Sequence, residues 1–216
     1  MSGASIEAER VSRRYGRRWA LAEVSFRIEG GTVLIVAGPN GSGKSTLLRV
    51  LATAIRPDGG TLRVGGFDAR THREDVRRMS AILGHASYLY EALTARENLE
   101  VFAAHMPGGA ANVESLLARV GLAERASDAV ATFSAGMRKR LSFARVLLQQ
   151  PQLALFDEPY GQLDPPGFLL VDDLVRELKA AGSTVVMATH QVDRGRGLGD
   201  VVLSLEAGRV RELARC

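Results

Sequence analysis

The stretch that decides the fold is VLIVAGPNGSGKSTLLRVL, residues 33–51. It opens with five apolar residues in a row, Val33 to Ala37, which is typical of a strand buried on both faces of a parallel sheet. A glycine-rich loop follows, and residues 46–51 then show a helical pattern. Similar apolar runs recur at 153–156 and 184–188, each after a helical pattern. This alternation predicts an α/β fold with a parallel sheet.

The glycine-rich loop, called the P-loop below, consists of Gly38, Pro39, Asn40, Gly41, Ser42, Gly43, Lys44 and Ser45. It matches the phosphate-binding pattern G-x-x-x-x-G-K-[ST] in its required place between a strand and a helix. Glycines let backbone N–H groups close around phosphate oxygens, and the following helix points its positive end at the same anion. Lys44 can add a charge at the β and γ phosphates, and Ser45 can hold Mg²⁺. These features predict nucleotide binding.

Two further segments complete the expected architecture. Apolar and polar residues alternate over 24–28, which predicts a half-buried strand of antiparallel character. Thr94 and Glu97 form a capping box, and Asn112 can cap a second helix. We therefore expect a helical lobe at about 86–130, inserted into the sheet domain.

Composition excludes several classes of protein. The 216 residues are 46% hydrophobic and 24% charged, the balance of a globular chain rather than a disordered one. No apolar run approaches the 18 to 20 residues or so of a membrane-spanning helix. Residues 1–10 lack a signal-peptide core, and Cys216 is the single cysteine, so a reducing cytoplasmic setting is expected. The net charge of +4 is weak support for nucleic-acid binding, which we do not expect.

Three more segments carry candidate chemistry. Asp157 and Glu158 end an apolar strand, where one carboxylate can organise Mg²⁺ and the other can accept a proton from water. Ser134 opens a helix after a turn of small residues and is a suitable helix cap. Asp164 follows the carboxylate pair, and His190 comes directly after the strand that ends at Thr189.

In this order and spacing, the segments from Tyr15 to His190 resemble the ATP-binding-cassette family. The resemblance implies a single domain over 1–216, with a P-loop NTPase core, an antiparallel β subdomain and an inserted helical subdomain. It also implies a head-to-tail homodimer or pseudo-dimer that closes on two ATP molecules. Hydrolysis then reopens the dimer.

The resemblance implies a role for each matching residue within one chain. Tyr15 would stack on adenine, and the Walker A segment from Gly38 to Thr46 would bind the phosphates, with Lys44 also catalytic. Asp157 would be the Walker B acid that holds Mg²⁺ together with Ser45. Glu158 would be the general base, and His190 the switch histidine.

Other roles implied by the resemblance lie across the dimer or depart from the family pattern. Ser134 and Gly136 would face the γ-phosphate bound by the partner, and Asp164 would belong to the D-loop. His85 stands where the family has a metal-contacting glutamine, and Met137 replaces a polar residue of the signature turn. We retain His85 as a candidate metal ligand, because imidazole can bond water or metal.

The expected setting is that of a transport ATPase. Without a spanning segment, transport requires a separate integral membrane permease, with this chain bound peripherally at the cytoplasmic face of the cell membrane. Only 26 residues follow His190, too few for a regulatory domain. The Gly84-His85 pair, residues 93–99 and the Ser-Ala-Gly turn look most like the haem-exporter subunits of cytochrome c maturation.

Three alternatives remain open at this stage. One is a drug or polysaccharide exporter subunit, since cargo is chosen by the membrane partner. A second is a soluble cassette ATPase that acts on ribosomes or DNA. A third, a nucleotide kinase, would need an acceptor pocket and a lid in place of the serine-glycine turn.

Overall fold

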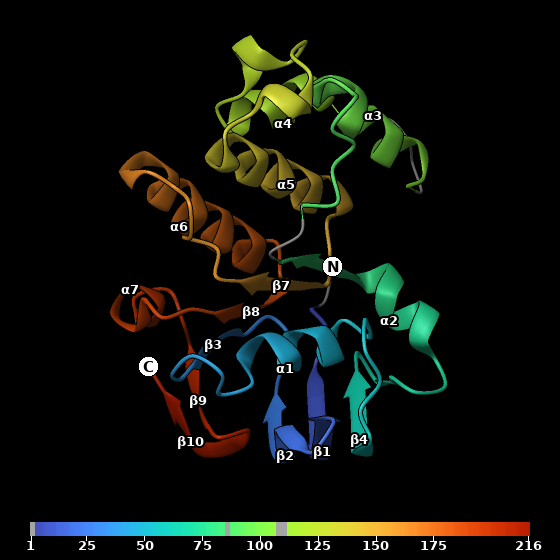
Figure 1. Cartoon of the computed structure of the whole chain (residues 1–216), viewed down its shortest axis with the longest axis vertical. Coiled ribbons are helices and arrows are strands. Elements are labelled where there is room, and N and C mark those ends of the chain that lie inside the picture. Colours follow the sequence, from blue (N-terminus) through green and yellow to red (C-terminus); the bar gives the residue numbers. More distant parts are fainter. Residues whose placement is uncertain (1–2, 85–86, 107–111) are drawn as a thin grey trace. The chain divides into compact units, whose positions relative to one another are not determined.

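The computed structural model describes residues 3–84, 87–106 and 112–216, which divide into two compact units (Figure 1). The first unit comprises Met1–Gly84, Pro151–Pro159 and Leu174–Cys216, and the second comprises His85–Gln150 and Tyr160–Asp173. The segment 86–130, expected to be helical, falls within the second unit.

A six-stranded sheet forms the centre of the first unit. Its order is β10 (Arg209–Arg215), β9 (Val201–Glu206), β3 (Val33–Ala37), β8 (Thr184–Ala188), β7 (Leu153–Asp157) and β6 (Ser80–Leu83). The strands from β9 to β6 are parallel, and β10 is antiparallel to β9. Every residue of β3, β7 and β8 is buried, as their apolar runs predict. The expected α/β class with a parallel sheet is confirmed.

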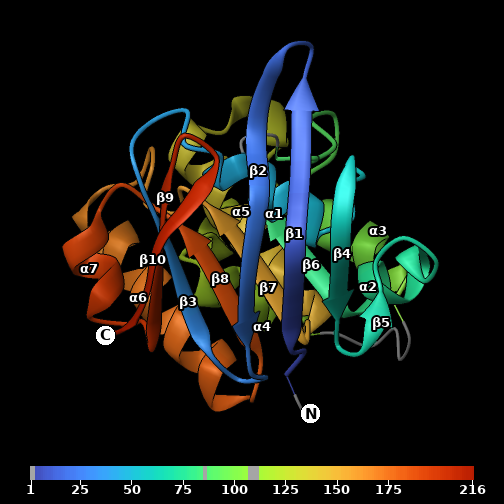
Figure 2. The same cartoon turned by 90° about the horizontal axis from the view of Figure 1, so that it is seen from below.

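A second, antiparallel sheet belongs to the same unit (Figure 2). Its order is β2 (Arg18–Ile28), β1 (Ile6–Tyr15), β4 (Gly59–Val64) and β5 (Phe67–Asp68). Val24, Phe26 and Ile28 are buried, while Ser25 and Arg27 are exposed. The predicted alternation is therefore confirmed, with one face of β2 turned toward the core.

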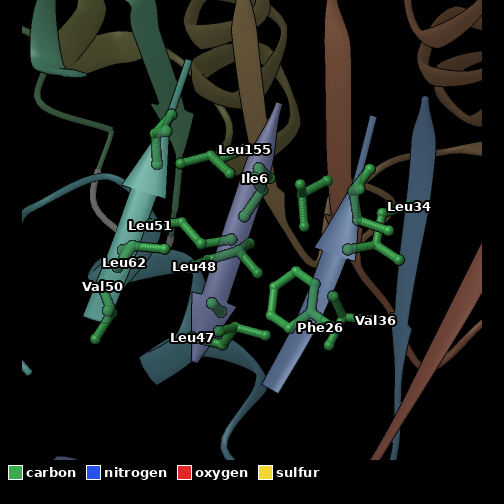
Figure 3. Close-up of a cluster of buried hydrophobic side chains, with 14 of the residues drawn as sticks. Ile6, Phe26, Leu34, Val36, Leu47, Leu48, Val50, Leu51, Leu62 and Leu155 are labelled. Atoms are coloured by element: carbon green, nitrogen blue, oxygen red, sulfur yellow. The ribbon is translucent and has the colours of Figure 1, made fainter. Parts of the chain in front are cut away.

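Helix α1 (Lys44–Leu51), which follows the P-loop, contacts β2 of the antiparallel sheet and β7 and β8 of the parallel sheet. Leu47, Leu48 and Leu51 are fully buried in a cluster with side chains of both sheets, among them Phe26 and Leu155 (Figure 3). Each buried leucine contributes roughly 1.5–3 kcal/mol of transfer free energy. The helix that begins at the P-loop is thus also a central part of the hydrophobic core.

The carboxyl end of α1 has an unusual backbone. Its C-cap is Ala52, and the next residue, Thr53, has a φ of 54°, in the left-handed region that glycine normally fills. Thr53 is 3% exposed, and its hydroxyl has no hydrogen-bond partner. Arg73, in α2 (Arg73–Met79), donates from Nε to the Thr53 carbonyl at 2.8 Å.

The first unit also contains α7 (Val192–Arg196).

The second unit is built from helices α3 (Ala95–Ala104), α4 (Val113–Arg119) and α5 (Ala135–Gln149), which contact one another in pairs. Short 3-10 turns occur at Ala123–Arg125 and Val130–Thr132, and α6 (Pro165–Ala180) runs from this unit into the first. None of the described helices is long and apolar enough to cross a membrane.

The predicted caps of the second unit are confirmed. The Thr94 hydroxyl and the Glu97 side chain each accept from the other residue's backbone N–H, and Asn112 accepts from Ser115 N at 3.0 Å. Asn98, which is fully buried, fixes the loop before α3. Its Oδ1 accepts from Tyr90 N at 2.8 Å, and its Nδ2 donates to the carbonyls of Tyr90 and Thr94 at 2.9 Å.

Candidate nucleotide-binding site

The parallel register brings the predicted site segments of the first unit to one edge of the sheet. Strand β8 lies between β3 and β7, and its last residue, Ala188, pairs with Val36 on one side and Asp157 on the other. The P-loop follows β3, the carboxylates end β7, and His190 follows β8. Ligand sites in open α/β sheets lie at these carboxyl ends.

Close backbone approach explains two of the P-loop glycines. Gly38 has a φ of 146°, and a Cβ there would lie 2.2 Å from the Leu205 carbonyl oxygen. Gly43 has a φ of 110°, and its Cβ would lie 2.4 Å from the Ala20 carbonyl oxygen. The loop can hold this conformation only without side chains at these two positions.

Lys44 is 7% exposed, and its ammonium group lies inside the loop. Nζ donates to the carbonyl oxygens of Gly38 and Pro39, at 2.7 and 3.1 Å. Over the described residues, the lysine forms no ion pair. Nearby, the buried Ser42 hydroxyl has no partner. A buried cation held only by neutral carbonyls, beside an unsatisfied hydroxyl, suits an anion such as a phosphate chain.

The rest of the P-loop is more open. Pro39, Asn40 and Gly41 are exposed, and Thr46 is half-buried in the first turn of α1. The first N–H groups of a helix have no acceptor within it. The loop and helix start therefore present donors to the same space.

Ser45 and Asp157 are joined although they are far apart in the chain. Ser45 Oγ donates to Asp157 Oδ1 at 2.9 Å, and Asp157 is 4% exposed. A hydroxyl and a carboxylate are oxygen ligands of the kind that Mg²⁺ takes alongside phosphates and water. No group of three or more His, Cys, Asp or Glu side chains suited to a metal occurs in the described ranges. The pair fits a Mg²⁺ ion that is held partly by its nucleotide.

Glu158 and His190 form the second contact of the site. His190 Nδ1 lies 2.7 Å from Glu158 Oε2, and Glu158 N donates to the Ala188 carbonyl at 2.8 Å. The glutamate has a φ of 49°, a strained value of the kind that collects at functional sites. Its side chain is 23% exposed, so water can reach the carboxylate.

The predicted signature turn lies in the second unit. Ser134 is exposed and caps α5, accepting from Met137 N at 3.2 Å, as expected for a helix cap. A Cβ at Gly136 would lie 3.0 Å from the Gln162 carbonyl oxygen. The turn and the loop around Gln162 therefore pack closely, with the serine at the surface.

Asp164 has partners that the sequence did not reveal. Its Oδ1 accepts from Arg140 Nη2 at 2.8 Å and from Gly167 N at 3.0 Å, so the residue caps the start of α6. The Arg140 hydrogen bond holds the pKa of Asp164 below its ordinary value against the opposing effect of burial, and the Gly167 N–H lowers it further. Arg140 is thus a residue of this region that sequence reasoning missed.

Tyr15 and His85 are the remaining predicted site residues. Tyr15 lies at the tip of the β1–β2 hairpin, 48% exposed, with the Arg13 guanidinium 5.1 Å from its ring centroid. His85 lies outside the described residues.

The comparisons with known proteins agree with this geometry. Residues 21–161 match the family model of the ABC transporter. The chain is 39% identical over 214 residues to the daunorubicin resistance ATP-binding protein DrrA3 of Streptomyces coeruleorubidus, covering 97% of this chain and 68% of that protein. It is 34% identical over 212 residues to the Nod factor export ATP-binding protein I of Mesorhizobium japonicum, covering 96% of this chain and 62% of that protein. It therefore spans about two thirds of the length of these curated relatives.

A solved structure extends the likeness to the whole fold. It is the dimeric structure of an ATP-binding cassette in a post-hydrolysis state, bound to ADP and Pi. The TM-score is 0.88 at 25% identity, over 97% of this chain and 98% of the solved one. The chain belongs to the ABC transporter family, and it is one of the family's ATPase cassettes.

Proposed function

We propose that the chain is the ATP-hydrolysing subunit of an exporter, and that it works by closing with a second cassette around ATP. The observation that carries the proposal is the meeting of the P-loop, the Ser45–Asp157 pair and the Glu158–His190 pair at one sheet edge. Such an edge holds a phosphate chain, a metal position and a base together.

Binding is assigned to the P-loop. The amides at the start of α1 and the Lys44 ammonium bind the phosphates, and Ser42 supplies a further buried donor. Ser45 and Asp157 hold Mg²⁺. When bound, the metal offsets negative charge on the phosphate oxygens.

Hydrolysis is assigned to Glu158 and His190. The Glu158 carboxylate accepts a proton from the attacking water, and its position is fixed by the strand pairing of its own backbone. His190 bonds the same carboxylate and so fixes the direction of its second oxygen. Both side chains have access to solvent, which the entry of water requires.

The second half of each site is assigned to a partner cassette. Ser134 and Gly136 lie at an exposed helix start, where N–H groups can face an anion held by another copy. The dimeric cassette structure with ADP and Pi supports this arrangement. The loop that carries Asp164 lies at the same interface. Tyr15 stacks on the adenine of the ATP that is bound by its own chain.

The partner in the membrane is an integral permease, with this chain bound at the cytoplasmic face of the cell membrane. The similar proteins named for daunorubicin resistance and Nod factor export favour a cargo of the drug or Nod-factor kind. Their names give no support to haem export, which the Gly84-His85 pair and the signature turn suggested. We therefore propose that the exporter carries a drug or a compound of the Nod-factor kind rather than haem.

Complementation between two inactive chains tests the proposal. Lys44→Ala removes the phosphate charge, and Ser134→Arg blocks the exposed helix start. Each variant alone loses both composite sites, whereas a mixture restores one site in every mixed dimer. ATP-dependent pairing, measured by light scattering, should appear in the mixture and in the unmodified chain, and in neither variant alone. Pairing absent from both the mixture and the unmodified chain would count against nucleotide-driven dimerisation.

A further inference from the structure

The tip of the β1–β2 hairpin places a cation on the same face as Tyr15. Tyr15 pairs directly with Arg18 across the hairpin, and Gly16 and Arg17 form the two-residue turn between them. Residues directly opposite each other in an antiparallel pair share one face of the sheet. Arg18 therefore lies on the same face as Tyr15, whose ring is proposed to stack on adenine.

Arg18 reaches from this hairpin to the rim of the P-loop. Its Nη2 donates to the Gly41 carbonyl oxygen at 3.5 Å. A Cβ added at Gly41 would lie 3.3 Å from the same nitrogen, so the guanidinium lies directly against the loop. Residues 23 positions apart thus meet where the phosphates are expected.

Two neighbouring arginines of this hairpin, Arg13 and Arg14, have partners, whereas Arg18 has no carboxylate partner among the described residues. Arg13 Nη1 pairs with Asp58 at 3.2 Å and Arg14 stacks on Trp19 at 5.8 Å. Within the part of the chain that the structure describes, the one side-chain hydrogen bond of Arg18 is long and goes to a neutral carbonyl. A guanidinium has five N–H donors, so most of its capacity is unused.

We propose that Arg18 is a further phosphate-binding residue, which donates to a phosphate oxygen of ATP from the hairpin side of the P-loop. The inference deepens the proposed function and rests on it. A planar guanidinium is well suited to phosphate oxygens, and a second cation near Lys44 becomes favourable once an anion lies between them. The contact also ties the hairpin that carries Tyr15 to the phosphate chain.

Arg18→Ala tests the inference, with Arg17→Ala as the matched control. Arg17 is exposed in the same turn and makes no hydrogen bond to the P-loop among the described residues. Calorimetric titration with ATP and with GTP should show about tenfold weaker binding for Arg18→Ala, and unchanged binding for Arg17→Ala. The factor should be equal for the two nucleotides, because their phosphate chains are identical.

The outcomes separate this inference from the proposed function. Unchanged affinity of Arg18→Ala overturns the inference, and so does a loss confined to ATP, which would indicate a contact to the base. Failure of the unmodified chain to bind either nucleotide overturns the proposed function itself. Arg18→Lys keeps the positive charge but lacks the planar guanidinium, so it should bind the nucleotides with intermediate affinity. This variant also controls for a folding defect of Arg18→Ala.

Discussion

Glu158 and His190 lie 32 positions apart in the chain, yet Oε2 of the first and Nδ1 of the second are 2.7 Å apart. The contact arises because β7 and β8 are adjacent and parallel, so that both residues leave the sheet at the same edge. A hydrogen bond between the proposed base and a neighbouring imidazole fixes the carboxylate without burying it.

The first prediction follows from this contact. Glu158→Gln keeps the size of the side chain and removes the proton acceptor. Turnover, measured as phosphate release, should fall by about 10² to 10⁴, while ATP still binds. Glu124→Gln, the same change at an exposed residue of the second unit, should leave turnover unaltered. Full activity of Glu158→Gln would remove the glutamate from the mechanism.

The second prediction concerns the strained end of α1. Left-handed backbone costs a non-glycine residue roughly 1–2 kcal/mol, and the unpartnered Thr53 hydroxyl adds to this cost. Replacing Thr53 by glycine removes this cost, but the greater freedom of glycine in the unfolded chain offsets about 0.5–1 kcal/mol of the stabilisation. Thr53→Gly should therefore raise the free energy of unfolding by about 1 kcal/mol, measured by urea denaturation. Thr53→Ala, which keeps the Cβ, should gain less; a destabilised glycine variant contradicts the argument.

The third prediction concerns the buried amide of the second unit. Asn98→Ala removes three short hydrogen bonds and leaves the groups of Tyr90 and Thr94 without their partner. At about 1 kcal/mol for each bond, the loss should be roughly 3 kcal/mol in denaturant unfolding. Asn112→Ala, which removes an exposed cap of α4, should cost only about 1 kcal/mol. Equal losses for the two variants would show that Asn98 does not organise the loop.

The fourth prediction is a dependence of stability on pH. Burial raises the pKa of Asp200, but the Lys179 ammonium at 2.6 Å and the Val33 N–H at 2.9 Å outweigh it, and the pKa lies below the ordinary 3.8. A pKa that is lower in the folded chain than in the unfolded chain stabilises the fold above the unfolded value. This stability is lost as the pH falls through the folded value.

Melting temperatures of the unmodified chain and Asp200→Asn should therefore differ most at neutral pH. The difference should shrink as the pH is lowered toward about 3. A difference that is constant over this range would show that the Asp200 charge does not contribute to stability.

Local features of this fold could be predicted from the sequence, and long-range ones could not. The strand Val33–Ala37 and the caps at Thr94 and Ser134 lie where the sequence places them, because each depends on neighbouring residues. The contacts of Arg18 with Gly41 and of Arg140 with Asp164 join segments 23 and 24 positions apart. Such pairs depend on hairpin register and helix packing, which spacing along the chain does not encode.

The double role of α1 has a consequence for genetic screens. Its first turn carries Lys44 and Ser45, while Leu47, Leu48 and Leu51 of the same helix are fully buried. Inactive variants that map to this helix will often show reduced amounts of cellular protein as well as lost activity. At exposed Ser134, by contrast, abundance should stay normal, so that expression level alone sorts the two kinds of defect.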